Sequence, residues 1–188
     1  RARQFPEDAG PLAHPVRPAS YIEINNFYTA TVYEKGAELV RMMQTIVGKE
    51  AFEKGVRRYL SDNDGLAATV EDFVSAIEVE SGTDLTHFME WYRQAGTPSV
   101  SIEKHYDEAS CLCQLTFRQA NAPTPGQDKK GPLHIPIRLG LLDETGAEIP
   151  LCFDGENPSD APLQRTINLL APKEIIEFVC VKSNPVVS

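Results

Sequence analysis

The stretch Phe88-Met-Glu-Trp-Tyr-Arg-Gln-Ala-Gly-Thr-Pro-Ser-Val-Ser-Ile102 marks the point where the pattern of the sequence changes. Before it, apolar residues recur every three or four positions, which is typical of amphipathic helices. After it, apolar residues alternate with polar ones, as in strands that are buried on one face. Gly96 and Pro98 lie between the two patterns and are residues that end a helix. The change predicts two domains of different class, with a boundary near residue 97.

The first half of the chain predicts helices after an irregular, proline-rich start. The segments with helical spacing are residues 33–47 with a stop at Gly48, residues 49–61, a helix from Thr69 to Gly82, and a short helix after Asp84. The run Thr69-Val-Glu-Asp72 has the form of a capping box, which marks a helix start. Prolines at positions 6, 11, 15 and 18 should break any helix near the beginning.

The second half predicts about six or seven short strands separated by turns. The alternating segments are residues 100–102, 112–117, 133–143, 149–153, 166–170 and 175–181. Such a series is typical of an antiparallel sandwich or barrel. The sequence therefore predicts an α+β fold with a helical domain over residues 1–96 and a β domain over residues 97–188. We interpret residues 123–130 as a mobile loop of the β domain.

Composition and charge exclude several classes of protein. The chain has 188 residues, of which 41% are hydrophobic, and a net charge of −9. The hydrophobic content suits a globular protein with buried cores rather than a disordered chain. Binding to nucleic acid or to an anionic membrane needs surplus Lys and Arg, which this chain lacks. No apolar run approaches the roughly 20 residues of a membrane-spanning helix, so we expect no nucleic-acid and no membrane partner.

Most signatures of catalysis are missing. The sequence contains no H-E-x-x-H, no G-x-S-x-G and no glycine-rich phosphate loop. Its four histidines are scattered, so we expect no metal site within this chain. Its four cysteines suggest reduced thiols in a cytoplasmic protein. A nucleophilic role for Cys111 or Cys113 with His105 is a weak alternative, because no motif orients the pair.

One stretch, Ile22-Glu-Ile-Asn-Asn-Phe-Tyr-Thr-Ala-Thr-Val-Tyr-Glu-Lys-Gly-Ala37, gathers polar and aromatic groups at the mouth of a helix. Amides at a helix start are free to face a ligand, and the helix dipole there favours negative charge. A phenol such as that of Tyr33 can donate a hydrogen bond to an oxyanion in this position. Alternatively, Tyr33 packs an interface. We expect Lys35 to be solvated.

The segment Asn25-Asn-Phe-Tyr-Thr-Ala-Thr-Val-Tyr-Glu-Lys-Gly-Ala-Glu38 resembles the M1 family of zinc aminopeptidases, in particular its bacterial aminopeptidase N branch. The resemblance continues in Gln4-Phe-Pro-Glu-Asp-Ala-Gly-Pro-Leu-Ala-His-Pro-Val-Arg-Pro18 and in Asp64-Gly-Leu-Ala-Ala-Thr-Val-Glu-Asp-Phe73. Residues 88–98 match as well, and Gly131-Pro-Leu-His-Ile-Pro136 resembles a strand start in the family's small β domain. The similarity covers essentially the whole chain.

The resemblance implies both a fold and a set of roles. The fold would be the helical C-terminal part of a thermolysin-like catalytic domain, followed by an antiparallel β-sandwich. Tyr33 would be the catalytic residue that donates its phenolic hydrogen to the oxyanion, and Tyr28 would line the pocket for the first substrate side chain. Asn25 and Glu34 would lie near the site, either in contact with the substrate or just behind the residues that contact it. Alternatively, Glu34 is a carboxylate that stabilises the start of the helix. Peptides would be the substrates, and zinc would be the cofactor of the full-length protein.

Two segments of the family are missing from this sequence. Neither G-A-M-E-N, which binds the substrate's amino group in the family, nor the zinc-binding H-E-x-x-H occurs here. The chain starts at Arg1 rather than Met, so we interpret it as an internal piece of a longer protein. Its partners would be the remaining catalytic and C-terminal helical domains of the same polypeptide. The isolated chain would bind no zinc and be inactive.

A second function hypothesis is a non-enzymatic module, helical cap and β domain together, that binds a partner protein. The missing zinc ligands favour it. A further expectation concerns the apolar residues Ile22, Ile24, Phe27 and Tyr28, which face other parts of the protein if the chain is a piece. Exposed apolar patches cause association, so we expect the isolated chain to self-associate.

Overall fold

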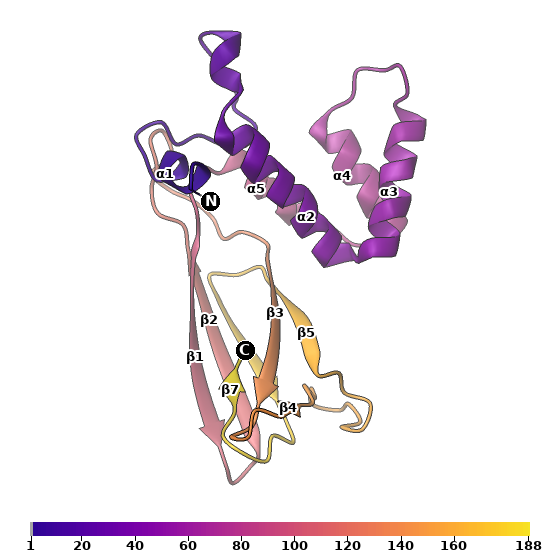
Figure 1. Ribbon diagram of the computed structural model, residues 1–188, viewed down its shortest axis with the longest axis vertical. Coiled ribbons are helices and arrows are strands. Elements are labelled where there is room, and N and C mark those ends of the chain that lie inside the picture. Colours follow the sequence, from indigo (N-terminus) through magenta and orange to yellow (C-terminus); the bar gives the residue numbers. More distant parts are fainter. Residues whose placement is uncertain (1) are drawn as a thin grey trace. The chain divides into compact units, whose positions relative to one another are not determined.

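The computed structural model describes residues 2–188, which form two compact units (Figure 1). The helical unit contains the chain up to Thr97 together with residues 122–134. The β unit contains residues 98–121 and 135–188. The fold class is α+β, as the sequence predicts. A single boundary at residue 97 does not describe this division, because residues 122–134 also belong to the helical unit.

The helical elements within residues 2–188 lie mostly where the apolar spacing predicts them. In chain order they are α1 Gln4–Asp8, the 3₁₀ turn η1 Ile24–Phe27, the π-helical turn η2 Thr31–Lys35, α2 Gly36–Val47, α3 Lys49–Asp62, α4 Val70–Ser81, the 3₁₀ turn η3 His87–Met89 and α5 Glu90–Arg93. Helix α1 contradicts the expectation that prolines exclude a helix here. Pro6 is tolerated because it lies in the first turn, where no backbone N–H needs an intrahelical partner.

Local signals set the ends of the long helices. The Thr69 hydroxyl accepts a hydrogen bond from the Asp72 amide (3.2 Å), and the Asp72 carboxylate accepts one from the Thr69 amide (2.8 Å). This is the capping box that the sequence predicts. Helix α4 ends at Gly82, which has the left-handed φ of 67°. Gly48 separates α2 from α3 with a φ of 82°.

Helices α3 and α4 lie side by side in the helical unit (Figure 1). They approach closely at Gly55, where an added Cβ would lie 2.5 Å from Ile77 Cδ1 and 2.8 Å from Ile77 Cα. Phe73 packs edge-on against the rings of Phe52 and Tyr59, with centroid distances of 6.4 and 5.2 Å. Gly55 and the aromatic cluster around Phe73 therefore determine how α3 packs against α4.

Residues 122–134 are fastened to the helical unit by side chains. The Gln127 side chain accepts a hydrogen bond from the Ala95 amide (2.8 Å) and donates one to the Arg93 carbonyl (2.7 Å). Lys130 Nζ donates to the carbonyl oxygens of Ala95 (2.7 Å) and Ala122 (2.8 Å). The expectation that residues 123–130 belong to the β domain is therefore wrong. These residues belong to the helical unit.

The β unit contains two antiparallel sheets. Its strands are β1 Ser99–Asp107, β2 Leu112–Ala120, β3 Ile135–Leu142, β4 Glu148–Ile149, β5 Gln164–Leu169, β6 Lys173–Phe178 and β7 Val186–Val187. One sheet has the order β1-β2-β6, and the other has β4-β3-β5 with β7 also paired to β3. The strand expected over residues 149–153 is shorter than predicted, because Pro150 has no amide to continue the ladder.

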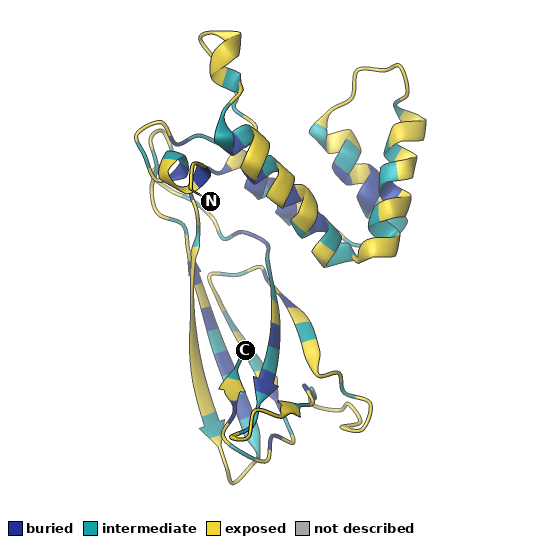
Figure 2. Cartoon of the chain, in the orientation of Figure 1, coloured by how far each residue is buried: buried dark blue, intermediate teal, exposed yellow. Residues whose placement is uncertain are grey.

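The core of the β unit lies between these two sheets. Alternate positions of β2 and β3 are buried, which is the pattern of strands with one face inward (Figure 2). The buried residues that form this core are Cys113, Leu115, Phe117, Leu139, Leu141, Leu151, Ile167, Leu169, Phe178 and Val181. The arrangement is a sandwich, one of the two alternatives that the strand pattern allows.

Candidate functional site

Tyr33 lies at the middle of the π-helical turn η2, and 60% of the residue is exposed. The ring of Tyr28 stacks on it, with a centroid distance of 6.2 Å and an interplanar angle of 23°. Tyr28 is itself 59% exposed. The structure thus brings together the two tyrosines for which the sequence analysis expects roles at the site.

These rings continue into a larger aromatic strip, which we define as Tyr21, Phe27, Tyr28 and Tyr33. Phe27 meets Tyr28 edge-on at 6.3 Å and Tyr21 at 5.9 Å. Edge-on and offset contacts at such distances are the favourable arrangements for aromatic rings. Next to the strip, Ile22 is 95% exposed. The strip offers an open apolar surface with phenol groups on it.

The other two expected site residues are also exposed. Asn25 lies in η1, and its carbonyl accepts a hydrogen bond from the Tyr28 amide (3.4 Å). Glu34 directly follows Tyr33 in η2. Both residues are therefore accessible to a ligand, and their roles stay predictions.

The first residue of the π-helical turn is held by a carboxylate from α1. Glu7 Oε1 accepts hydrogen bonds from the Thr31 amide (2.7 Å) and from the Thr31 hydroxyl (2.5 Å). Thr31 is fully buried. Burial raises the pKa of Glu7, but the hydrogen bonds from Thr31 and the nearby His14 bring this pKa below its usual value of 4.5 overall. The carboxylate therefore stays charged and supplies a cap that a helix start needs.

The last residue of the turn is held by the next carboxylate of α1. Lys35 Nζ donates to Asp8 Oδ2 (2.9 Å) and to the Gly96 carbonyl (2.9 Å), and it lies 5.9 Å from the centroid of the Trp91 ring. The expectation that Lys35 is solvated is wrong, since only 8% of it is exposed. The sequence could not reveal this, because Asp8 lies 27 residues earlier in the chain.

Asp8 is the centre of a buried polar network. Its Oδ1 accepts a hydrogen bond from the Gly96 amide (2.8 Å), and its Oδ2 accepts one from the Thr97 hydroxyl (2.9 Å). Burial raises the pKa of Asp8, but the hydrogen bond and charge of Lys35, with the other donors, lower it below 3.8 overall. The Asp8–Lys35 pair is therefore a charged pair whose groups are hydrogen-bonded.

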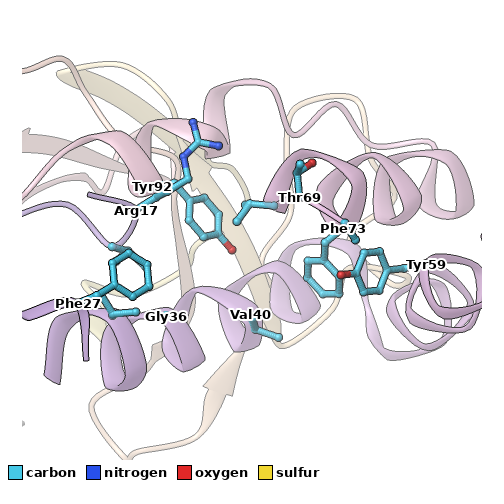
Figure 3. A pocket seen from close by; sticks show the side chains of 12 residues that line it. Arg17, Phe27, Gly36, Val40, Tyr59, Thr69, Phe73 and Tyr92 are labelled. Carbon is cyan, nitrogen blue, oxygen red and sulfur yellow. The ribbon is translucent and has the colours of Figure 1, made fainter. Parts of the chain in front are cut away.

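The helical unit also contains an apolar cavity of about 480 Å³. Figure 3 shows Phe27 and Gly36 at one end, Tyr59 and Phe73 at the other, and the Tyr92 ring between them. Burial raises the pKa of Tyr92 to about 12, so its hydroxyl keeps its proton. Sequence reasoning missed this cavity, because residues from six separate segments line it.

The described side chains form no metal site. Within residues 2–188, no group of three or more His, Cys, Asp or Glu side chains could hold an ion. Likewise, none of the helices in this range is both long enough and apolar enough to pass through a membrane.

The cysteine hypothesis finds little support in the β unit. All four cysteines have free thiols. Cys113 is fully buried, and burial raises the pKa of its thiol. A nucleophilic cysteine needs the opposite, a lowered pKa and access to substrate. His105 lies opposite Gln114 in the strand register, and its side chain is exposed.

Comparison with known proteins gives the family. The model described as Peptidase family M1 domain matches residues 1–92. The chain belongs to the M1 peptidase family. A second model, described as a domain of unknown function (DUF3458) with an Ig-like fold, matches residues 96–188 of this M1 chain. The resemblance found in the sequence is thereby confirmed, and the Ig-like description agrees with the two-sheet β unit.

Relatives of this M1 chain are aminopeptidases. Aminopeptidase N of Haemophilus influenzae is 45% identical over 186 residues, which are 99% of this chain and 21% of the relative. Aminopeptidase N of Escherichia coli gives the same identity and coverage. Aminopeptidase N of Caulobacter vibrioides is 61% identical over 110 residues, 58% of this chain and 13% of the relative. The chain spans 21% of the length of the first two curated relatives.

A solved structure agrees with the sequence relatives. The crystal structure of Legionella pneumophila aminopeptidase A in complex with aspartic acid matches this M1 chain with a TM-score of 0.77 at 30% identity. The match covers 93% of this chain and 18% of that one. The α+β arrangement is therefore shared with an aminopeptidase of known structure.

Proposed function

We propose that this chain forms part of an aminopeptidase in which the Tyr33 phenol donates a hydrogen bond to the reacting carbonyl oxygen of a peptide. The observation that carries the proposal is the exposed Tyr33 on a π-helical turn whose two end residues are buried and hydrogen-bonded. Local π-helical turns are rare and occur frequently at functional sites. The aminopeptidase relatives give the reaction class.

In peptide hydrolysis, the proposed role of Tyr33 is to stabilise the charge that develops on the carbonyl oxygen. When a nucleophile adds to a peptide carbonyl, the carbon becomes tetrahedral and the oxygen gains negative charge. A fixed donor stabilises that oxygen more than it stabilises the neutral carbonyl of the substrate, so it lowers the barrier. One such donor is worth about two to three orders of magnitude in turnover.

The neighbouring residues would bind the substrate. Tyr28 stacks on Tyr33 and would contact the first side chain of the peptide, while Asn25 and Glu34 would contact polar groups of the substrate. We place no metal in this chain, since its described residues do not form a metal site, and no step of the proposal runs through one. A zinc ion, the other domains of a full-length protein, peptide substrates and a cytoplasmic location stay predictions.

The test is Tyr33→Phe in the full-length protein that carries this chain, with an alanyl chromogenic amide as substrate. We expect turnover to fall about 100- to 1,000-fold, because the ring and its stacking remain while the donor is lost. Tyr106→Phe is the matched control. Its hydroxyl donates to the Val181 carbonyl inside the β unit (3.0 Å), so this variant removes a phenol hydroxyl that belongs to the other unit.

Two outcomes would contradict the proposal. Near-normal turnover of Tyr33→Phe would remove Tyr33 from catalysis. The second outcome combines two results. The full-length protein would hydrolyse no aminoacyl amide, and both it and this chain alone would bind the same partner protein in a pull-down. That combination would favour the interaction module. The isolated chain is expected to be inactive and to contain no zinc after dialysis, and one zinc per chain would overturn the expected absence of a metal site.

A further inference from the structure

The turn that carries Tyr33 is held at both ends by one short helix. Glu7 and Asp8 are adjacent in α1, and they bind the first and last residues of η2, Thr31 and Lys35. Both of these end residues are buried, whereas Tyr33 between them is exposed. Two neighbouring carboxylates thus bracket the five residues of the turn.

We propose that Glu7 and Asp8 are positioning residues, which fix the π-helical turn and thereby the direction in which the Tyr33 phenol points. The inference rests on the proposed role of Tyr33 and extends it to α1. Neither carboxylate is proposed to touch the substrate. They act through the backbone of the turn.

The position of Tyr33 depends on its backbone because little else holds the ring. Tyr28 is its one aromatic neighbour among residues 2–188, and that ring is itself largely exposed. The π-helical turn is an uncommon backbone conformation, so the surrounding contacts must select it over a regular α-helical turn. A carboxylate on the Thr31 amide and an ion pair on Lys35 supply such contacts at each end.

Substitution of the two carboxylates is expected to affect folding to different degrees. Asp8 is 1% exposed and accepts hydrogen bonds from Gly96 and Thr97 as well as from Lys35, so its loss would disturb the fold. Glu7 is only partly buried, and its carboxylate accepts hydrogen bonds from the amide and the hydroxyl of Thr31. Glu7 is therefore the residue with which to separate positioning from folding.

The experiment changes Glu7→Ala in the full-length protein and measures kcat, KM and the affinity for a phosphinic peptide. The phosphinate oxygens imitate the oxyanion of the tetrahedral intermediate. We expect kcat and phosphinate affinity to fall roughly 10- to 100-fold, with KM within about threefold of wild type. Glu38→Ala is the matched control, because Glu38 is exposed on α2 and forms a surface ion pair with Arg41. It should leave all three quantities unchanged.

The same substitution in a Tyr33→Phe background decides whether Glu7 acts through Tyr33. If it does, Glu7→Ala costs nothing further once the phenol is gone. An equal loss in both backgrounds would overturn the inference, as would normal kcat for Glu7→Ala. A near-normal Tyr33→Phe single variant would instead overturn the proposed function, so the two failures are distinguishable.

A second variant guards against misfolding. Glu7→Gln keeps an oxygen that can accept from the Thr31 amide, but it removes the charge. We expect it to recover part of the kcat lost in Glu7→Ala. If Glu7→Ala does not fold, the cycle is run with Glu7→Gln, and wild-type kcat for that folded variant would contradict the inference.

Discussion

The ammonium group of Lys35 and the carboxylate of Asp8 are both nearly excluded from solvent, at 8% and 0% side-chain exposure. An isolated buried charge is very unfavourable, and the two groups compensate one another only because further hydrogen bonds satisfy them. Gly96 contributes both its amide, to Asp8, and its carbonyl, to Lys35. The pair therefore joins α1, the π-helical turn and the end of the helical segment at a single point.

This pair gives the stability of the chain a dependence on pH. The folded chain lowers the pKa of Asp8 below 3.8, so folding favours the carboxylate. That stabilisation is present above the usual pKa and is lost as the pH falls through the lower, folded pKa. We expect the free energy of unfolding of the wild type to fall more steeply below about pH 4 than that of Asp8→Asn/Lys35→Met.

The measurement is urea unfolding of the chain at dilute concentration over a series of acidic pH values. The double variant removes both charges together, so it leaves no unpaired buried ion. Identical pH slopes for the two proteins would show that Asp8 does not contribute. The Glu7 carboxylate, whose pKa is also lowered, remains in both proteins and adds equally to each slope.

At the level of single residues, the sequence predicts exposed groups better than buried ones. Tyr28, Asn25 and Glu34 were expected at an accessible site, and all are exposed. Lys35 was expected in solvent as well, since a lysine is rarely buried without a partner. Its partner is set by tertiary structure, and no local pattern could have indicated it.

Among the elements, the pair α3 and α4 depends on the absence of one side chain. A Cβ at Gly55 would lie 2.8 Å from the Ile77 Cα, which belongs to the backbone and cannot swing away. Alanine is the better helix former by about 1 kcal/mol, but the overlap would push the helices apart. We expect Gly55→Ala to lower the free energy of unfolding by about 1–3 kcal/mol.

Gly36→Ala is the matched control for this prediction. Gly36 is also helical, and an added Cβ there would meet only Val16 Cγ1 at 3.5 Å, an ordinary contact. This variant should be as stable as the wild type or slightly more stable. Thermal unfolding of the two variants checks the pair, and an unchanged midpoint for Gly55→Ala would show that the helices can separate at no cost.

Elements were predictable where the signal is local. The capping box at Thr69 and the stops at Gly48 and Gly82 are short-range features, and the structure has them. The sequence predicts a regular helix from residue 33, whereas the π-helical turn covers Thr31–Lys35. Apolar spacing does not reveal a turn that contains one added residue. Residues 122–134 were misjudged because their partners lie in the helical unit, far away in sequence.

For the molecule as a whole, exposed apolar area is the feature with the clearest consequence. Ile22, Ile24 and Tyr28 are 95%, 52% and 59% exposed, and they lie together in one short segment. Water-exposed apolar groups in such a cluster favour association. We expect the isolated chain to self-associate as its concentration rises, and Ile22→Lys to weaken that association.

Sedimentation velocity over a wide range of concentrations measures this. A sedimentation coefficient of the wild type that stays constant and monomeric would contradict the prediction. Equal association of wild type and Ile22→Lys would place the contact elsewhere on the chain, for example at the exposed strand β1, which has one free edge.

Residues 122–134 also affect the order of events during synthesis on the ribosome. The Trp91 indole donates to the His134 carbonyl (2.8 Å), and the His87 ring bonds the Pro132 carbonyl (3.0 Å). Both acceptors leave the ribosome only after β1 and β2 have been made. A nascent chain stopped at residue 121 would therefore hold every long helix but lack its fastening segment. The ribosome must therefore synthesise the whole β1–β2 hairpin before the helical unit can complete its folding. Domains generally fold from the N-terminus onward, so this order is unusual.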